Sequence, residues 1–325
     1  MGSGLLDHEP RWLGPLALAT IYVVWGSTYL AIRVMVEDIP PLLGAGVRFL
    51  IAGAILYAWL AWRRAPSARA VTGRQLAGAA IVGLLLMFGG NGLVTVAEQE
   101  VPSGLAALLI SSVPLWVIVL RASYGRERVP ASTLVSVAVG FMGVALLVLP
   151  GDRPEGAPLG WSLLVVTAAV FWASGSFAAP RVERPGDVLA ATAWQMLIGG
   201  GAMVAVGLAI GEATELHLDE VGTDSWAAFV FLVLVGSIAA FTAYNWLLRH
   251  VAISTVATYA FVNPVIAVFL GWAILSEEIT AYVVAGTAVI VASVAFVVLS
   301  PAEKAPAAGS ARFGSPGKGG GPNVE

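Results

Sequence analysis

Few side chains in this sequence could do chemistry away from water, and Arg48 is the first of them. It lies within a long apolar run, seven residues after Pro41, which at helical rise is on the order of 10 Å from the start of that run. A guanidinium at that depth can hold a carboxylate or phosphate through paired hydrogen bonds. It can equally form an ion pair with Glu98 or Glu37, or bind helix-end carbonyls, as buried charges usually do. The sequence leaves both interpretations open.

Uncharged polar and aromatic side chains in the apolar runs could line a cavity or simply pack helices. The run Gly89-Gly90-Asn91-Gly92 has no preceding strand, so it is not a phosphate-binding loop. Close helix packing explains its glycines, and an interhelical bond explains its asparagine as well as a cavity does. With Arg48, the candidates for contact with a substrate are Trp25, Thr28, Asn91, Ser112, Trp116, Trp172, Ser176, Tyr244, Tyr259 and Asn263.

Two prolines near the centres of apolar runs, Pro114 and Pro264, are candidate hinges. Each removes a backbone hydrogen bond and frees the carbonyl four residues earlier, at Ile110 and at Ala260. The serines and the asparagine just before the prolines could satisfy those carbonyls. The alternative, which is compatible with the first, is that both kinked helices curve around a central cavity.

The remaining inventory argues against an enzyme. The chain has no cysteine, its three histidines lie in flanks or connections, and no Asp or Glu is expected within an apolar run. A membrane-embedded enzyme needs a nucleophile and a base, or metal ligands, at one depth. The sequence therefore predicts no catalytic residues, no metal site and no cofactor. A scaffold or receptor is not excluded on these grounds and remains an alternative, with an intramembrane enzyme behind it.

Composition sets the solvent in which these side chains act. Hydrophobic residues make up 58% of the chain, charged residues 11%, and the mean hydropathy is +0.86, which is typical of a polytopic membrane protein. About 20 residues of helix cross the bilayer core. Ten runs approach or exceed that length: Leu13–Val36, Pro41–Trp62, Arg74–Ala97, Pro102–Ala122, Ala131–Leu149, Leu159–Ala179, Val188–Ile210, Ser225–Leu248, Ala252–Leu275 and Thr280–Leu299.

Charged residues between the runs alternate in sign. If the N-terminus is cytoplasmic, fourteen of the seventeen basic residues fall on the cytoplasmic side, only Arg153 falls outside, and Arg33 and Arg48 stay within runs. Lys and Arg concentrate in cytoplasmic connections. The count predicts that both termini face the cytoplasm. Arg33 lies within one turn of a helix end and is expected to extend toward the headgroups.

The chain repeats itself with an offset of 147 residues. This offset carries Trp25 onto Trp172 and Gly53 onto Gly200, whereas Gln195 falls where the first copy has Arg48. Because each copy holds an odd number of runs, the second would enter the membrane from the opposite side. The prediction is an all-α polytopic fold of ten transmembrane helices in two inverted five-helix repeats. The repeats occupy residues 12–149 and 159–299, between a cytoplasmic N-terminus at 1–11 and a disordered cytoplasmic tail at 300–325.

Three stretches carry a family resemblance: WGSTYLAIRVMVEDIPPLLGAGVRFLIAG at 25–53, NGLVTVAEQEVPSG at 91–104 and ATYAFVNPVIAVFLGWAILSEE at 257–278. They resemble the EamA family of the drug/metabolite transporter superfamily, in particular its YedA-like bacterial members. The resemblance extends over roughly residues 12–299. It implies ten helices in two inverted repeats, and carrier-type transport of small metabolites, amino acids or drugs, commonly outward. It identifies the architecture better than the substrate.

The function predicted from sequence is therefore a transporter of small metabolites in a bacterial inner membrane, an exporter or facilitator that works by alternating access. Its partners are a small-molecule substrate and the lipid bilayer; no nucleic acid is expected, and a homodimer is left open. Carriers that move protons usually hold an Asp, Glu or His within the membrane. All twenty acidic residues can be placed in connections, termini or span ends, unless Glu98 lies deeper than its position suggests. The inventory thus predicts transport that needs no proton gradient.

Overall fold

The computed structural model describes residues 12–65, 71–124, 129–148, 158–251, 253–256 and 258–299, and every regular element within these ranges is a helix. The expected all-helical class is confirmed for this part of the chain. The terminal segments 1–11 and 300–325 lie outside the described residues.

The first half of the chain forms five helical segments, two of which change their geometry along the way. The elements are α1 (Leu13–Met35), α2 (Pro41–Trp62), α4 (Gly73–Gly83) continuing through the π-helical η1 (Leu84–Gly92) into α5 (Leu93–Ala97), α6 (Ser103–Ile110) followed by α7 (Val113–Tyr124), and α8 (Ala131–Val148).

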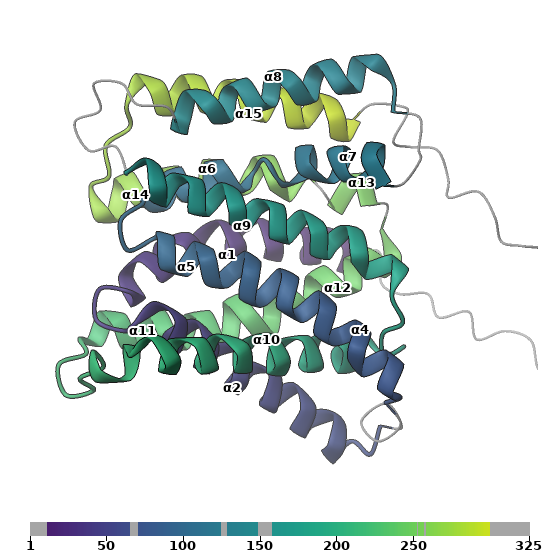
Figure 1. Ribbon diagram of the computed structural model, residues 1–325, viewed down its shortest axis with the longest axis vertical. Helices are drawn as coiled ribbons and strands as arrows, with labels where there is room; N and C mark the ends of the chain where they lie inside the picture. The colour runs from purple at the N-terminus through teal and green to yellow at the C-terminus, as the bar shows by residue number, and fades with distance from the viewer. Residues whose placement is uncertain are drawn as a thin grey trace, which may run out of the picture.

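The second half follows the same order. Its elements are α9 (Leu159–Ala178) with the short η2 (Ala179–Arg181), α10 (Val188–Ile210), η3 (Glu212–Thr214), α11 (Thr223–Phe231) continuing through the π-helical η4 (Leu232–Ala239) into α12 (Ala240–His250), α13 (Ile253–Val256), α14 (Tyr259–Leu275) and α15 (Ala281–Leu299). All these helices run across the molecule side by side, from α8 and α15 at one edge to α2 at the other (Figure 1).

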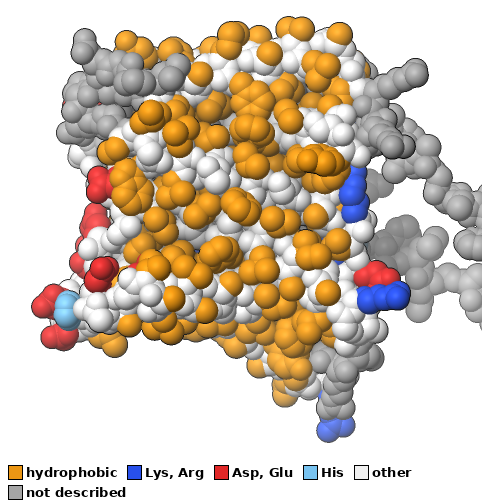
Figure 2. All heavy atoms as spheres, viewed as in Figure 1, with side chains coloured by type: hydrophobic (Ala, Val, Ile, Leu, Met, Phe, Trp, Pro, Cys, Tyr) orange, Lys and Arg blue, Asp and Glu red, His pale blue; other side chains and the backbone are white. Residues whose placement is uncertain are grey.

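The exterior is that of a membrane protein. Among the described residues, eight helical segments are long and apolar enough to cross a bilayer, and residues 262–275 and 281–296 form two shorter apolar helices. Figure 2 shows a wide apolar band on this face, with Asp and Glu side chains at one edge and, at the opposite edge, Lys and Arg side chains together with some acidic ones. The charge asymmetry read from the sequence is thus present in three dimensions.

The helix ends use ordinary local chemistry. The Asp187 carboxylate accepts hydrogen bonds from the first free N–H groups of α10, and that helix ends at Gly211, whose φ of 95° suits a residue without a Cβ. Thr72 and Gln75 cap α4 reciprocally. These caps fix the residue at which each helix starts, and therefore the position of every side chain along the helix axis.

Helices α2 and α10 meet through small residues near the middle of α2. A Cβ on Gly46 would lie 2.8 Å from the Gly200 carbonyl oxygen, and one on Gly53 would lie 3.0 Å from the Ala193 carbonyl oxygen. The two contacts are equivalent under the 147-residue offset, because it carries Gly46 onto Ala193 and Gly53 onto Gly200. Only such small residues let two helix backbones approach so closely. The crossing therefore lies between Gly46 and Gly53, close to Leu50.

The two π-helical segments stand at equivalent places in the two halves, since η1 and η4 begin 148 residues apart and end 147 residues apart. Each adds an extra residue to a turn, which rotates the side chains that follow relative to those before. Such distortions occur frequently at functional sites. No sequence pattern predicted them.

Carboxylates from the second half cap helices of the first half at the acidic edge. Glu212 accepts hydrogen bonds from the backbone N–H of Leu42 (3.1 Å) and of Leu43 (2.7 Å), in the first turn of α2. Glu277 does the same for the first two N–H groups of α6. Free N–H groups and the helix dipole both favour an anion there. The halves are thus joined through helix termini as well as through apolar packing.

Asp38 makes the reciprocal connection from the first half to the second. Its carboxylate accepts hydrogen bonds from the Ser225 hydroxyl (2.6 Å) and the Gly222 N–H (3.0 Å), at the start of α11. These donors, that of Ser225 first, lower the pKa of Asp38 from its ordinary value.

Candidate functional site

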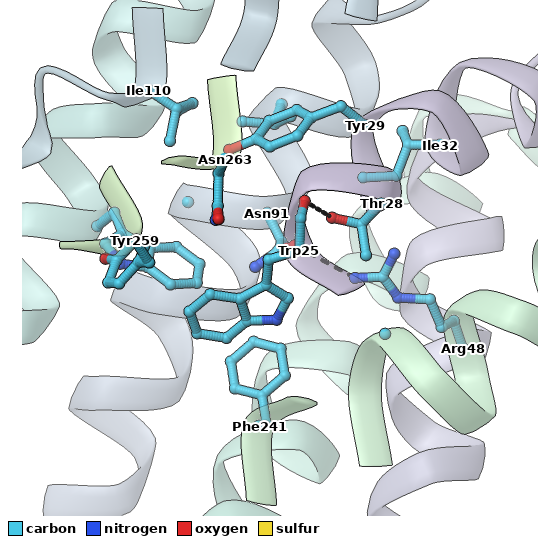
Figure 3. A pocket seen from close by; sticks show the side chains of 14 residues that line it. Trp25, Thr28, Tyr29, Ile32, Arg48, Asn91, Ile110, Phe241, Tyr259 and Asn263 are labelled. Carbon is cyan, nitrogen blue, oxygen red and sulfur yellow. Dashed lines mark hydrogen bonds between the residues drawn. The ribbon is translucent and has the colours of Figure 1, made fainter. Parts of the chain in front are cut away.

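A cavity lies between the two halves, around Trp25. About 580 Å³ of space not filled by protein atoms lies in it, and part of that space is open to the outside. Side chains from α1, α2, η1, α9, α12 and α14 point into it (Figure 3). The lining residues are Trp25, Thr28, Tyr29, Ile32, Arg48, Gly90, Asn91, Val94, Ile110, Trp172, Gly236, Phe241, Tyr259 and Asn263. Both π-helical segments contribute to this wall.

Most of the wall is aromatic, and Trp25 is its centre. The Trp25 ring lies 6.1 Å from that of Trp172, 5.2 Å from Phe241, 4.9 Å from Tyr244 and 5.4 Å from Tyr259, between centroids. Several of these contacts are edge-on, the arrangement that aromatic quadrupoles favour. Trp25 and Trp172 are also related by the 147-residue offset. A contact between equivalent residues places both where the two halves meet, and offers an apolar or aromatic ligand a rigid surface.

Arg48 brings a cation to this aromatic wall. Its side chain is only 2% exposed, its Nη2 donates to Asn91 Oδ1 at 3.2 Å, and its guanidinium lies 4.3 Å from the Phe49 ring centroid. Its Nε and Nη1 have no hydrogen-bond partner among the described residues. A buried donor left without a partner costs about 1–3 kcal/mol, and more when charged. The guanidinium is therefore held by one amide and a ring, with two donors free for an anion.

The ion pair considered for Arg48 in the sequence is not formed. Among the described residues no ion pair of 4.0 Å or less joins Arg48 to Glu98 or Glu37, whereas the exposed Arg74 and Glu183 do form one. Glu98 is instead wholly buried on its own. Glu98 keeps the span-end position expected for it, directly after α5, but its side chain is turned away from the surface. The sequence could not reveal this, because it gives the position of Glu98 along the helix but not the direction of its side chain.

Seven of the predicted candidates meet at the cavity: Trp25, Thr28, Arg48, Asn91, Trp172, Tyr259 and Asn263. Tyr244 packs behind them on Trp25. The Asn263 amide fits with its nitrogen donating to the carbonyls of Tyr22 and Tyr259, which ties α14 to α1. The Thr28 hydroxyl donates to the Trp25 carbonyl, leaving its lone pairs free toward the cavity.

Three predicted candidates lie outside the cavity wall. The Ser112 hydroxyl donates to the Leu109 carbonyl and that of Ser176 to the Trp172 carbonyl, so both serve their own helices. Trp116 packs against Phe141, with ring centroids 4.6 Å apart.

The sequence missed Tyr29 and Phe241 among the larger side chains of the wall. Tyr29 was detectable, since it stands four residues after Trp25 and so on the same helix face. Phe241 was not, because it follows the π-helical η4, which shifts the face that each later residue presents.

The two candidate hinges differ in local structure. The chain breaks at Ser111 and Ser112, just before Pro114, so that α6 and α7 are separate helices; Ile110, with its predicted free carbonyl, borders the cavity. Pro264 lies inside the continuous α14. The helix is therefore interrupted near Pro114 and continuous through Pro264, and the hinge role of both prolines stays a prediction.

A model of the EamA-like transporter family matches residues 12–149 and 159–299. The chain is 38% identical over 295 residues to the "Uncharacterized inner membrane transporter YedA" of Escherichia coli K12, covering 89% of this chain and 92% of that protein. It is 26% identical over 286 residues to a "Probable amino-acid metabolite efflux pump" of Salmonella typhimurium LT2, covering 86% and 92%.

A solved structure described only as "Crystal structure of protein" is similar with a TM-score of 0.60 and 20% identity, covering 88% of this chain and 97% of that one. At that identity the similarity supports the fold alone. The family resemblance read from the sequence is confirmed.

Proposed function

The chain belongs to the EamA-like transporter family, and we propose that it carries small metabolites across the bacterial inner membrane by alternating access, as an exporter or facilitator. Amino acids, related metabolites and drugs are the substrate classes considered. The cavity around Trp25 is the proposed binding site. A relative named as an amino-acid metabolite efflux pump supports this assignment.

The observation that carries the proposal is the pair of free donors on Arg48 beside an aromatic wall. A guanidinium forms short, strong hydrogen bonds with a carboxylate, and a substrate carboxylate would satisfy both donors at once. The rings around Trp25 would hold an apolar or aromatic body. The preferred substrate is therefore an amphipathic carboxylate, such as an aromatic or large aliphatic amino acid.

We further propose ten transmembrane helices in two inverted repeats, residues 12–149 and 159–299. The support is the agreement of three features with one offset: the α2–α10 contacts, the π-helical segments and the Trp25–Trp172 pair. Sites in transporters of this kind lie between the repeats near the bilayer midplane. Arg48 stands about two residues, or roughly 3 Å at helical rise, from the α2–α10 crossing. Pro114 and Pro264 are the proposed points where bending opens one side.

The proposed orientation, with both termini cytoplasmic, follows from the distribution of Lys and Arg. Reporter fusions test it. Fusions after Arg69, Arg126 and Arg184 should report the cytoplasm, and fusions after Glu100 and Asp219 should report the exterior. A single reversed reporter would contradict the inverted arrangement.

Ligand binding tests the site. Purified protein is heated with L-phenylalanine or with L-phenylalaninamide, which keeps the ring and the ammonium but lacks the carboxylate. A ligand that binds only the folded protein raises its melting temperature. L-Phenylalanine should raise it, and the amide should do so far less. An equal shift with both compounds would contradict the role of Arg48.

Transport is tested in proteoliposomes. Vesicles loaded with unlabelled L-phenylalanine should accumulate labelled L-phenylalanine by counterflow, which a scaffold or receptor cannot produce. Uptake that does not saturate, or that is equal in vesicles without protein, would contradict a carrier.

A further inference from the structure

Glu98 is a buried acid that the proposed binding site does not use. It directly follows α5, its side chain is 0% exposed, and neither of its carboxylate oxygens has a hydrogen-bond partner among the described residues. A carboxylate taken out of water without hydrogen bonds is strongly disfavoured, and the group is stabilised by binding a proton. Its position is therefore suited to a change of charge rather than to a permanent one.

Glu98 follows a helix that lines the cavity, although its own side chain is not among the lining residues. Asn91 and Val94 border the cavity, and Glu98 comes four residues after Val94, one turn further toward the acidic edge. Asn91 in turn holds the Arg48 guanidinium. One helix thus carries the group that orients the cation and, two turns away, the unpaired acid.

The charged and titratable groups around Glu98 come from three neighbouring elements. Tyr29 and Arg33 belong to α1, Arg48 belongs to α2, and Glu277 follows α14; the charge on Glu98 interacts with all four. Arg33 donates to the backbone carbonyls of Glu98 and Gln99 rather than extending to the headgroups as expected. Glu277 is satisfied by the N-terminus of α6. Arg48 is the cation whose charge a substrate would compensate.

We infer that Glu98 is a proton-binding site linked to Arg48, so that a substrate carboxylate on Arg48 drives the uptake of one proton by Glu98. The inference rests on the proposed function, because it takes Arg48 as the carboxylate-binding group. In the empty site the charge of Arg48 favours the ionised form of Glu98, although the two side chains form no ion pair. A substrate carboxylate bound to Arg48 neutralises the guanidinium charge. The Glu98 carboxylate is then buried without a compensating cation, which favours its protonation.

The proton comes from the aqueous phase on the side to which the site is open, and it forms an O–H bond with a Glu98 carboxylate oxygen. The empty site holds one cation and one anion; the loaded site holds the cation, the substrate anion and a neutral acid. The net charge of the site is unchanged, so substrate and proton cross together, which of the two proposed modes suits the facilitator rather than the exporter. This replaces the expectation of proton-independent transport, which assumed that no acid is buried among the helices.

Linkage is reciprocal: if the anion promotes protonation, the proton promotes anion binding to the same degree. The test uses 3-phenylpropionate, an aromatic carboxylate without an ammonium that could itself meet Glu98. Its affinity for the full-length protein in lipid nanodiscs is measured between about pH 6 and pH 8, where its own carboxyl stays ionised. Affinity should rise as pH falls, by at most about tenfold per pH unit for one linked proton.

Two variants assign the effect. In Glu98→Gln the affinity should become independent of pH, because the amide keeps the shape and cannot titrate. Glu100→Gln removes an exposed acid two residues away and should keep the wild-type pH dependence. A pH dependence that persists in Glu98→Gln would overturn the assignment to this residue.

Calorimetry of the wild-type protein keeps the test independent of any variant's folding. Titration with 3-phenylpropionate in buffers of different ionisation enthalpy counts the protons taken up, and up to one per bound anion is expected. Binding with no proton uptake would overturn the inference and leave the proposed function intact. No binding at any pH would overturn both.

Discussion

The two halves of the molecule present the same backbone to the cavity but different chemistry. In the first half α2 and η1 carry Arg48 and Asn91, joined by a hydrogen bond. The equivalent positions in α10 and η4 hold Gln195 and Ile238. Gln195 is 3% exposed, nearly as buried as Arg48, yet it does not line the cavity, and its Nε2 has no partner among the described residues.

The two halves therefore share their backbone geometry and helix packing, and they differ in the polar side chains that they present. The glycine contacts, π-helical segments and central tryptophans recur, whereas the cation and the amide that holds it occur once. Two halves with nearly the same backbone can adopt two conformations of similar energy. Because Arg48 and Asn91 occur in one half only, the substrate can bind in one orientation. Four substitutions can break or sharpen this contrast.

The largest effect, on the melting temperature, is expected where the backbones of α2 and α10 approach each other most closely. Gly46→Leu would put a side chain where even a Cβ lies 2.7 Å from Val204 and 2.8 Å from the Gly200 carbonyl. Overpacking of this kind costs about 1–3 kcal/mol or more, so the melting temperature should fall sharply. Gly201→Leu is the control, because nothing lies within 4 Å of its Cβ. Equal melting temperatures would contradict the close crossing.

Arg48→Gln makes the first half resemble the second. It removes the charged donors and should lower the affinity for L-phenylalanine about 10- to 100-fold, from the range of charge-assisted hydrogen bonds. Arg48→Lys keeps the charge without the planar fork and should fall between. Gln195→Ala should leave the affinity unchanged. A lower melting temperature with unchanged affinity for L-phenylalanine in Arg48→Gln would assign Arg48 a structural role.

Asn91→Ile tests the amide that holds the guanidinium, by introducing the residue of the other half. Loss of one hydrogen bond acceptor, about 1 kcal/mol, should weaken L-phenylalanine binding about fivefold. Ile238→Leu is the matched control in η4 and should bind normally. If Asn91→Ile binds as tightly as the wild type, Arg48 is oriented by something other than Asn91.

The smallest effect concerns Asp38, whose equivalent in the second half is Pro185. Its pKa in the folded protein is lowered by Ser225 and Gly222. Its contribution to stability is therefore present above the unfolded-state value of about 3.9 and is lost as pH falls through the lower folded value. The melting temperature should drop slightly less between pH 5 and pH 3 in Asp38→Asn than in the wild type. Identical drops would show that these hydrogen bonds contribute nothing.

The sequence predicted the helices well because their cause is local. Each predicted run agrees with helical structure to within a few residues wherever the chain is described, since length and hydropathy determine a helix in a bilayer. Trp25, Trp172 and Arg48 were found because they are unusual in type or repeated in position. Their meeting at one cavity required the fold.

The failures have two physical causes. A π-helical turn arises from packing and carries no composition signal, so Phe241 was missed. The direction of a side chain at a helix end depends on its neighbours, so the sequence placed Glu98 at a span end without showing that it is buried, and left open an ion pair with Arg48 that does not form. Serines such as Ser112 and Ser176 bond to their own helix, which their polarity alone could not distinguish from contact with a substrate.

The α2–α10 crossing also constrains how the protein is made. The two helices begin 147 residues apart, so at about 5–20 residues per second the ribosome needs on the order of 10 to 30 s to produce α10 after α2. Throughout that interval α2 stands in the membrane with its glycine face, Gly46 to Gly53, uncovered. Asn91 arrives much earlier and gives Arg48 its hydrogen-bond partner. The polar contact of the first half thus precedes the apolar crossing, and the first half must wait for the second before it can close.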